Sequence, residues 1–215
     1  MGRNPEMDAI RMAKTNQRIL AGAYRAFAER TIEGNTMNDV AKEAGLGVAS
    51  VYRYYPTKPD LVLGVSTWAW EKFYKEYVDR VSGKEIENRT GAEDFENYLD
   101  SFLYLYREHS DMLRFNQNFN LYMRSGEISA DRMNPYTEMI RAQARRFSIT
   151  YQKGKEDGTL RTDMPEEEMF SATMHLMLAV VTRYAVGLAY MEGTDIEKEL
   201  NLQKRMLMRE FVVEN

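Results

Sequence analysis

The sequence of 215 residues contains no cysteine, only two histidines and a single long apolar segment. Without cysteine the chain can form neither disulfide bonds nor thiolate metal sites, and it has no cysteine nucleophile. This composition fits a reducing compartment, and we expect a cytoplasmic protein. The first 15 residues alternate charged and apolar side chains, so no secretory signal is predicted.

The single long apolar segment, residues 171–191, approaches the length of roughly 20 residues that a membrane-spanning helix needs. His175, Arg183 and several threonine and glycine residues interrupt it. We therefore expect no membrane association, and we interpret the segment as a helix that is buried by neighbouring helices and by a second subunit.

Few residues suggest an enzyme. His109 and His175 are the only histidines, and neither has a metal-ligand spacing. The sequence also lacks a glycine-rich phosphate loop and a recognisable pair of nucleophile and base. We predict no catalytic residues, no metal site and no cofactor.

The composition is that of a globular protein. Apolar residues make up 44% of the chain, which is enough for a real core in one or two domains. Charged residues make up 29%, which argues against disorder. The net charge of −4 is distributed unevenly. Residues 1–60 hold nine Lys/Arg against seven Asp/Glu, a net of +2, which leaves −6 for the remainder. The N-terminal part is therefore the better candidate for binding an anionic partner.

The region that begins at Thr36 predicts a short helix with clear ends. The Thr36 hydroxyl can cap the first amides, and Asp39, three residues later, can complete a capping box. Val40 and Ala44 then form an apolar stripe, until Gly45 supplies the positive φ that ends a helix. A second helix over about residues 47–53 is too short to be stable alone, so it must pack on the first through Val51.

Two short helices joined by a glycine turn make a helix-turn-helix motif. In this motif the N-terminal part of the second helix enters the major groove. The residues that we expect to face DNA are Val48, Ala49, Ser50, Tyr52 and Arg53. After them, Thr57 caps the next helix, Pro59 suits its first turn and Lys58 adds a positive charge beside free amides, which favours phosphate binding.

At these positions the chain resembles the tetracycline-repressor (TetR) family. The resemblance is carried by Thr36…Val40-Ala41…Ala44-Gly45-Leu46…Ser50-Val51-Tyr52…Tyr54-Tyr55…Lys58…Leu61. It implies an all-α fold, with a three-helix DNA-binding domain over residues 1–60 and a helical effector-binding and dimerisation domain over residues 61–215. The motif covers about a quarter of the chain, and only this part is diagnostic.

The resemblance also implies roles for single residues. The phosphate contacts that it implies are Thr36, Tyr52, Tyr54 and Lys58; Asn38 lies in the same DNA-binding set, and base edges are approached by Ala49, Ser50, Tyr52 and Arg53. The chain departs from the family at Gly47, where a capping serine is usual, and at Ala49, where glycine is common. An alternative is therefore a helical small-molecule-binding protein without sequence-selective DNA binding.

Apolar spacing predicts further helices along the chain. A first helix over about residues 14–29 packs Ile19, Ala23 and Phe27 onto the motif. Four basic residues lead into this helix and form either a basic arm or a disordered terminus: Arg3, Arg11, Lys14 and Arg18. Later helices are expected at about residues 61–81, 92–108, 111–124, 130–156, 166–191 and 194–213, with a loop at 82–91. The last two resemble the pair through which the family forms homodimers.

The second domain has an unusual stock of methionine and aromatic residues, which favours a pocket for an apolar or aromatic effector. The candidate lining residues, each of which has an ordinary core role as the alternative, are Phe115, Phe119, Tyr122, Met123, Met139, Phe147, Tyr151, Met174, Met177 and Tyr184. Arg183 or His175 fixes a polar group of this ligand, or else makes an internal or cross-subunit hydrogen bond. Together with the resemblance, this predicts a ligand-responsive regulator, a repressor that binds a palindromic DNA operator as a homodimer.

Overall fold

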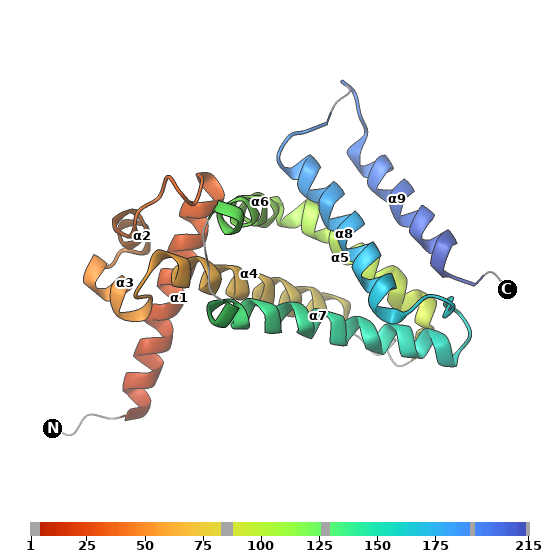
Figure 1. Cartoon of the computed structure of the whole chain (residues 1–215), viewed down its shortest axis with the longest axis horizontal. Helices are drawn as coiled ribbons and strands as arrows, with labels where there is room; N and C mark the ends of the chain where they lie inside the picture. Colours follow the sequence, from red (N-terminus) through yellow and green to blue (C-terminus); the bar gives the residue numbers. More distant parts are fainter. Residues whose placement is uncertain (1–4, 83–87, 126–129, 190–191, 214–215) are drawn as a thin grey trace. The chain divides into compact units, whose positions relative to one another are not determined.

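The computed structural model describes residues 5–82, 88–125, 130–189 and 192–213. Over these ranges the chain is all-α, as predicted (Figure 1). The helices are α1 (Pro5–Glu29), α2 (Met37–Ala44), α3 (Val48–Tyr54), α4 (Lys58–Val81), α5 (Gly91–Glu108), α6 (Ser110–Ser125), α7 (Ala130–Glu156), α8 (Glu166–Ala185) and α9 (Ile196–Phe211). Most of the predicted loop at 82–91 lies outside the described residues.

The start of α1 differs from the prediction. The helix begins at Pro5, nine residues before the expected Lys14. Proline suits the first turn because its missing N–H has no helical partner there, and Glu6 and Asp8 complement the positive end of the helix dipole. The predicted arm or disordered terminus is therefore wrong from Pro5 onward, where the chain is helical, and Arg3 lies outside the described residues.

The predicted cap of α4 is confirmed, because Thr57 precedes the helix directly and α4 begins at Lys58, three residues before the range 61–81 expected from apolar spacing. The predicted end of α8 was wrong. α8 ends at Ala185 instead of Met191, where the chain turns at Gly187 with a φ of 79°. The Leu188 amide then donates to the Arg183 carbonyl, which satisfies one of the last carbonyls of the helix.

The chain divides into two compact units. The first holds the residues up to Lys72 together with Phe115–Thr137, and the second holds Phe73–Arg114 together with the residues from Glu138 onward. The helices α4, α6 and α7 each contribute residues to both units. The functional boundary predicted at residue 60 falls inside α4 and stays a prediction.

The first unit has a continuous apolar core. Its buried residues come from α1 to α4 and from α6, and they include Ile19, Ala23, Phe27, Val40, Val51, Leu61, Val65, Phe115 and Phe119. The four-residue spacing of Ile19, Ala23 and Phe27 thus predicted the buried face of α1 correctly. The contribution of α6 was not predicted, since Phe115 and Phe119 were assigned to a ligand pocket.

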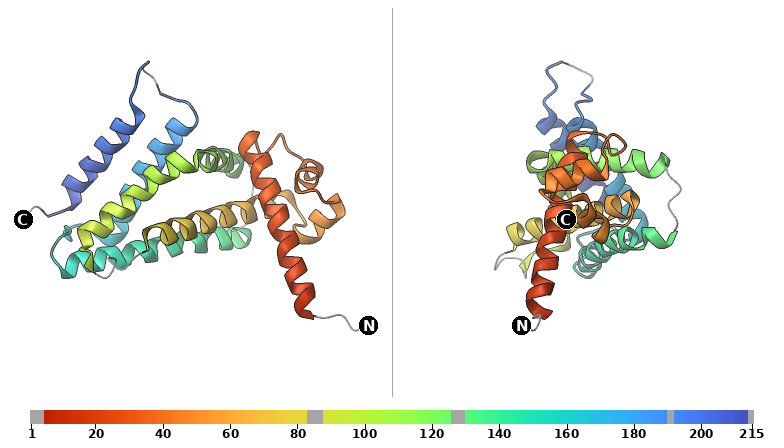
Figure 2. Two further views of the ribbon diagram at one scale, coloured as in Figure 1. Left: turned by 180° about the vertical axis from the view of Figure 1, so that it is seen from behind. Right: turned by 90° about the vertical axis from the view of Figure 1, so that its left-hand side faces the viewer.

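The second unit is built around α5, which packs against α8 and α9, while α8 also packs against α9. Figures 1 and 2 show α8 and α9 side by side and antiparallel. Fully buried Phe95 lies at the centre, with its ring centroid 6.3 Å from that of Phe147 on α7 and 5.9 Å from that of Phe211 on α9. Aromatic edge contacts of this kind stabilise a core beyond the area they bury.

No helix in the described ranges is both long enough and apolar enough to cross a lipid bilayer.

The crossing of α1 and α2 depends on Gly22. A Cβ atom placed at Gly22 would lie 2.8 Å from the backbone nitrogen of Ala44, which cannot move without shifting α2. We expect Gly22→Ala to destabilise the protein by about 1 to 3 kcal/mol, the usual cost of overpacking. The free energy of unfolding in urea measures this effect.

Gly47→Ala is the matched control. A Cβ atom at Gly47 meets nothing within 4 Å, and its φ of −73° suits any residue. This substitution removes only a tolerable helix cap and should cost less than about 1 kcal/mol. Equal losses in the two variants would show that the helix crossing does not depend on Gly22.

Candidate nucleic-acid interface and ligand cavity

The start of α2 has the predicted capping box. The Thr36 hydroxyl accepts a hydrogen bond from the Asp39 amide at 3.2 Å, and the Thr36 amide donates to the Asp39 carboxylate at 2.8 Å. The Thr36 hydroxyl also donates to the same carboxylate at 2.6 Å. These bonds favour the ionised form and hold the pKa of Asp39 below its ordinary value.

The end of α2 is fixed by Gly45 and by a residue from α1. Gly45 has a φ of 64°, and its amide donates to the Ala41 and Lys42 carbonyls. The Arg18 guanidinium donates to the carbonyls of Ala44 at 3.1 Å and Gly45 at 2.9 Å. The proposed role of Arg18 in a basic arm is therefore wrong, because its charge caps the negative end of α2.

The helix α3 buries one side and exposes the other. Val51 is fully buried in the core, whereas Ala49, Tyr52 and Arg53 are exposed. Val48 and Ser50 are partly exposed. Gly47 takes the N-cap position without a side-chain hydrogen bond. The helix therefore begins and ends one residue later than the predicted range 47–53, at Val48 and Tyr54.

A second capping box starts α4. The Thr57 hydroxyl accepts from the Asp60 amide at 3.3 Å, and the Thr57 amide donates to the Asp60 carboxylate at 3.1 Å. Arg132 of α7 lies 3.7 Å from this carboxylate. Two capped helix starts, those of α2 and α4, thus belong to the same compact unit as α3.

Lys58 lies at the start of α4 with contacts that the sequence did not predict. Its ammonium donates to the Glu33 carbonyl at 3.3 Å and lies 5.9 Å from the ring centroid of Tyr122 on α6. Partial burial lowers the pKa of Lys58, while the charges of Glu33 and Asp39 oppose this shift. Tyr122, predicted to line a ligand pocket, therefore contacts the lysine predicted to bind phosphate.

The tyrosines after α3 differ in their surroundings. Tyr54 is partly exposed, with the Arg53 guanidinium 5.5 Å from its ring centroid. Tyr55 is partly buried and packs against the core of the first unit, and its hydroxyl donates to Asn16 at 2.9 Å. Of the nine residues predicted to bind DNA, none is buried, and Asn38 is exposed on α2.

The second unit contains a cavity of about 240 Å³, here called the aromatic cavity. Its walls come from α4, α5, α7 and α8, and its aromatic lining consists of Tyr74, Tyr77, Tyr98, Phe102, Phe147 and Phe170. The Tyr77 hydroxyl donates to the Asn97 carbonyl at 2.7 Å, and the Tyr98 hydroxyl lies 3.3 Å from that of Thr173. Burial raises the pKa of both tyrosines well above the ordinary value, so both stay neutral.

Only two of the predicted ligand-binding residues, Phe147 and Met174, line the aromatic cavity. Phe115 and Phe119 belong to the core of the first unit, and Tyr122 and Met123 pack against it. Tyr151 and Met177 are buried in the second unit, where the Tyr151 hydroxyl donates to the Met164 carbonyl. Arg183 lines a separate groove. The sequence analysis missed the tyrosines of α4 and α5, whose helical spacing looks the same as that of core residues.

The helices α8 and α9 enclose that groove, which we call the α8–α9 groove. It is lined by Leu176, Ala179, Val180, Arg183, Gln203, Met206, Leu207 and Glu210. Leu176 is 50% exposed and Met206 60% exposed, so large apolar side chains face outward on both helices. Such a patch on a surface marks a site of interaction.

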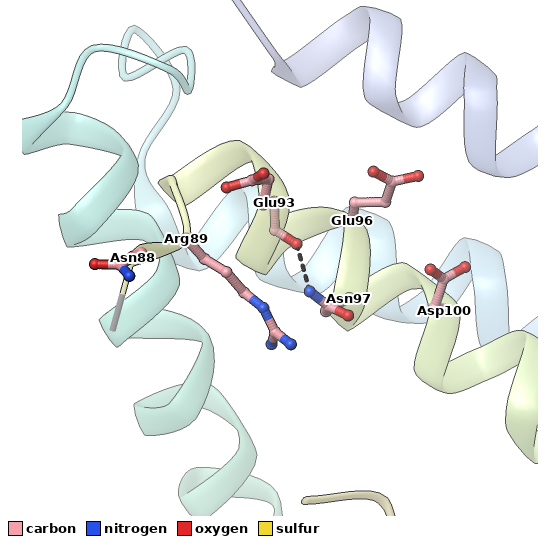
Figure 3. Close-up of a pocket in the computed structure, with 6 residues that line it drawn as sticks. All are labelled: Asn88, Arg89, Glu93, Glu96, Asn97 and Asp100. Atoms are coloured by element: carbon pink, nitrogen blue, oxygen red, sulfur yellow. Dashed lines mark hydrogen bonds between the residues drawn. The ribbon is translucent and has the colours of Figure 1, made fainter. Parts of the chain in front are cut away.

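A polar pocket lies along α5, lined by Asn88, Arg89, Glu93, Glu96, Asn97 and Asp100 (Figure 3). Its acidic groups already have partners. The Lys204 ammonium of α9 lies 2.8 Å from Glu96 and 2.6 Å from Asp100, and the Glu93 carboxylate accepts from the Thr90 amide at 2.6 Å. The Asn97 amide donates to the Glu93 carbonyl at 2.8 Å, which stabilises the helix itself. The ion pairs of Lys204 beside this pocket therefore join α9 to α5.

The two histidines lie apart from these features. The His109 Nε2 atom is 2.9 Å from the Glu76 carboxylate, which also accepts from the Tyr104 hydroxyl at 2.7 Å. His175 is exposed, and its Nδ1 atom lies 3.3 Å from the Ser171 hydroxyl, which fits the expected alternative of an internal hydrogen bond. Among the described residues, no group of three or more His, Cys, Asp or Glu side chains could hold a metal ion.

Protonation of Asp39 should weaken the start of α2. Because its pKa in the folded state lies below the ordinary value of 3.8, its contribution to stability is present above that value and is lost as the pH falls through the folded pKa. Asp39→Asn should therefore be less stable than the wild type at neutral pH, and the gap should narrow in strong acid. Urea unfolding at a series of pH values measures it.

Glu167→Gln, in the first turn of α8, is the control for a general effect of lost charge. The loss of unfolding free energy in Glu167→Gln should not depend on the Thr36 hydroxyl. The loss in Asp39→Asn should be smaller when Thr36 is replaced by valine. A gap for Asp39→Asn that stays constant to the lowest pH would contradict the capping role of the carboxylate.

Comparison with known proteins gives a consistent result. Residues 19–65 match the family model described as bacterial regulatory proteins, tetR family. An HTH-type transcriptional regulator of Staphylococcus aureus (strain USA300) is 44% identical over 50 residues, which cover 23% of this chain and 27% of the relative. The match thus spans little more than a quarter of that relative.

Solved structures extend the likeness in fold to nearly the whole chain. A transcriptional regulator from Saccharomonospora viridis, solved in complex with choline, has a TM-score of 0.72 at 17% identity and covers 94% of this chain and 100% of its own. FadR from Bacillus subtilis, in complex with stearoyl-CoA, has a TM-score of 0.69 at 14% identity and covers 89% and 97%. A TetR family protein from Vibrio parahaemolyticus has a TM-score of 0.68 at 17% identity and covers 92% and 98%. With the motif geometry of α2 and α3, these findings show that residues 19–65 match the tetR family of bacterial regulatory proteins, and that the chain shares its fold with the solved regulators.

Proposed function

We propose that this protein is a ligand-responsive transcriptional repressor that acts in the cytoplasm and reads DNA with α3. The observation that carries the proposal is the exposed face of α3, formed by Ala49, Tyr52 and Arg53, on a helix whose other side is fixed in the core by Val51. The capped starts of α2 and α4 add backbone amides and the positive ends of two helix dipoles, which suit phosphates.

We assign base contacts and phosphate contacts to different residues. The exposed Ser50 and Arg53 region of α3 approaches base edges, while Thr36, Asn38, Tyr52, Tyr54 and Lys58 approach the backbone. Since phosphate contacts are independent of sequence and fall with salt, the two groups have distinguishable effects on binding.

The active form in this proposal is a homodimer that joins through α8 and α9. The support is the α8–α9 groove with its outward-facing leucine and methionine residues. Two antiparallel helices from each subunit would form a four-helix interface. Two copies of α3 could then enter successive major grooves about 34 Å apart, which requires a palindromic operator.

The aromatic cavity is the proposed effector site, and a small apolar or aromatic effector releases the repressor from DNA. Neutral tyrosine and phenylalanine rings supply a lining that suits such a molecule. The similar folds solved with choline and with stearoyl-CoA bind those compounds themselves, and they support the proposal that a chain of this fold binds a small molecule.

Selection of bound DNA from a random pool tests the proposal directly. The purified protein should enrich a palindrome, and the complex should contain two or four chains. Absence of enrichment would favour the alternative, a small-molecule-binding protein that has lost sequence-selective DNA binding. Gly47 motivates that alternative, since it leaves the N-cap of α3 without a side-chain hydrogen bond.

Removal of the Lys58 charge should weaken binding to all DNA sequences alike. We expect Lys58→Ala to reduce the slope of log affinity against log salt by about one unit, because one phosphate contact is lost. Lys155→Ala, which removes an exposed charge at the end of α7, serves as the control and should leave the slope unchanged.

Substitution of Ser50 or Arg53 should instead change the preferred sequence. A slope that does not change in Lys58→Ala would remove Lys58 from the phosphate contacts. A uniform loss of affinity across all sequences in Arg53→Ala would show that Arg53 does not read bases.

A charge on the outer face of α8 or α9 should separate the subunits. We expect Leu176→Glu and Met206→Glu to convert the dimer into monomers, because each places a carboxylate in the proposed interface. The mass in solution, measured by light scattering after size exclusion, gives the result. Ile149→Glu is the control, since Ile149 is 71% exposed on α7 and lies outside the groove.

Monomers should bind a single half-site weakly and lose the palindrome preference. A Leu176→Glu protein that remains dimeric with unchanged mass would contradict the assignment of the interface to these helices.

A further inference from the structure

The aromatic cavity has a positive charge at its edge. Arg146 of α7 is part of the lining and is also exposed as a residue, so it lies where the cavity meets solvent. Its Nη1 atom donates to the side-chain oxygen of Gln143, a buried residue, at 3.1 Å. The guanidinium also lies 5.1 Å from the ring centroid of Tyr74. These two neutral partners hold Arg146 in place without neutralising it.

The one carboxylate in the lining is already paired. Asp94 of α5 lies 2.7 Å from the ammonium of Lys153, and both side chains are largely buried. No carboxylate among the described residues lies within ion-pair distance of Arg146. A second arginine, Arg89, lines the same cavity and donates to the Val81 carbonyl at 3.3 Å. The lining therefore carries an excess of positive charge.

The rest of the cavity wall is mostly apolar, although Ser82, Asn97, Ser101 and Thr150 also line it. Phe102, Phe147 and Phe170 contribute rings without polar atoms, and Met174 adds a flexible thioether. The Tyr98 hydroxyl is engaged by Thr173, which leaves its ring carbons as the accessible surface. An occupant with a hydrophobic body would replace water on these surfaces, and its charged end would lie next to Arg146.

We propose that the effector of this protein is a small organic anion, with an aromatic or short alkyl body in the aromatic cavity and a carboxylate bound by Arg146 beside Gln143. This inference rests on the proposed effector role of the cavity. Arginine binds carboxylates through parallel charge-assisted hydrogen bonds, and partial removal from water strengthens them.

A cationic ligand is the main competitor, because aromatic rings also bind quaternary ammonium groups. Two observations oppose it in this cavity. The Arg146 guanidinium already lies over the Tyr74 ring, and Lys153 neutralises Asp94, the carboxylate that would otherwise attract a cation. A second positive charge beside Arg146 would be repelled.

Matched acids and amides test the charge requirement. The probes are 4-phenylbutyrate and octanoate, their neutral amides, and phenyltrimethylammonium, titrated into the full-length protein by calorimetry. Because a hydrogen bond between charged groups is stronger than one to a neutral amide, at least one acid should bind about tenfold tighter than its amide. Equal binding of acid and amide, preferential binding of the cation, or binding of no probe would overturn the proposal.

The adjacent residues Arg145 and Arg146 allow a matched test of the role of Arg146. Arg146→Gln should remove most of the advantage of the acid over the amide, while Arg146→Lys should keep part of it. Arg145→Gln is the control, because Arg145 lies outside the lining and approaches Glu138 at 4.0 Å. Binding of the acid in preference to its amide that survives in Arg146→Gln, or that falls equally in Arg145→Gln, would contradict the role of Arg146 in binding the carboxylate. Melting temperatures near that of the wild type would show that the variants fold.

The outcome is separable from that of the proposed function. Selection of DNA without any of these probes tests the regulator role, whereas the acid-to-amide ratio tests only the chemistry of the cavity. A protein that selects a palindrome but binds amides as well as acids would retain the proposed function and lose this inference.

Discussion

A helix of seven residues is too short to be stable in water, and α3 is such a helix. Its position therefore depends on burial of Val51 in the core of the first unit. The same contact decides which face of α3 remains exposed. The proposed reading of DNA, with Ala49, Tyr52 and Arg53 facing outward, follows from that single constraint.

The surroundings of α3 restrict its position from both sides. Arg18 and Gly45 fix the end of α2, and the Thr57 capping box fixes the start of α4. Residues from α6, above all Phe115, complete the core on which these helices rest. The DNA-binding part of the chain is thus completed by a segment far away in sequence, which makes it sensitive to changes in that segment.

Local sequence signals were sufficient for α2, but not for the start of α1 at Pro5 or for the end of α8 before Gly187. The capping box at Thr36 and the stop at Gly45 gave the bounds of α2, since each acts on its own helix turn. Contacts between residues far apart in the sequence could not be predicted. Nothing near Phe115 distinguishes a core residue of the first unit from a pocket residue, and nothing near Tyr122 indicates its contact with Lys58. The cavity was missed for the same reason, because its aromatic lining has ordinary core spacing.

The proposed reading of DNA requires that two copies of α3 enter the major groove of one operator. Hydroxyl-radical footprinting on a selected operator maps the protection of the backbone at each nucleotide. We expect two protected segments related by two-fold symmetry, whose centres lie about 10 base pairs, or one helical turn, apart, or a multiple of this distance. A single protected segment, or uniform protection without symmetry, would contradict the proposed reading.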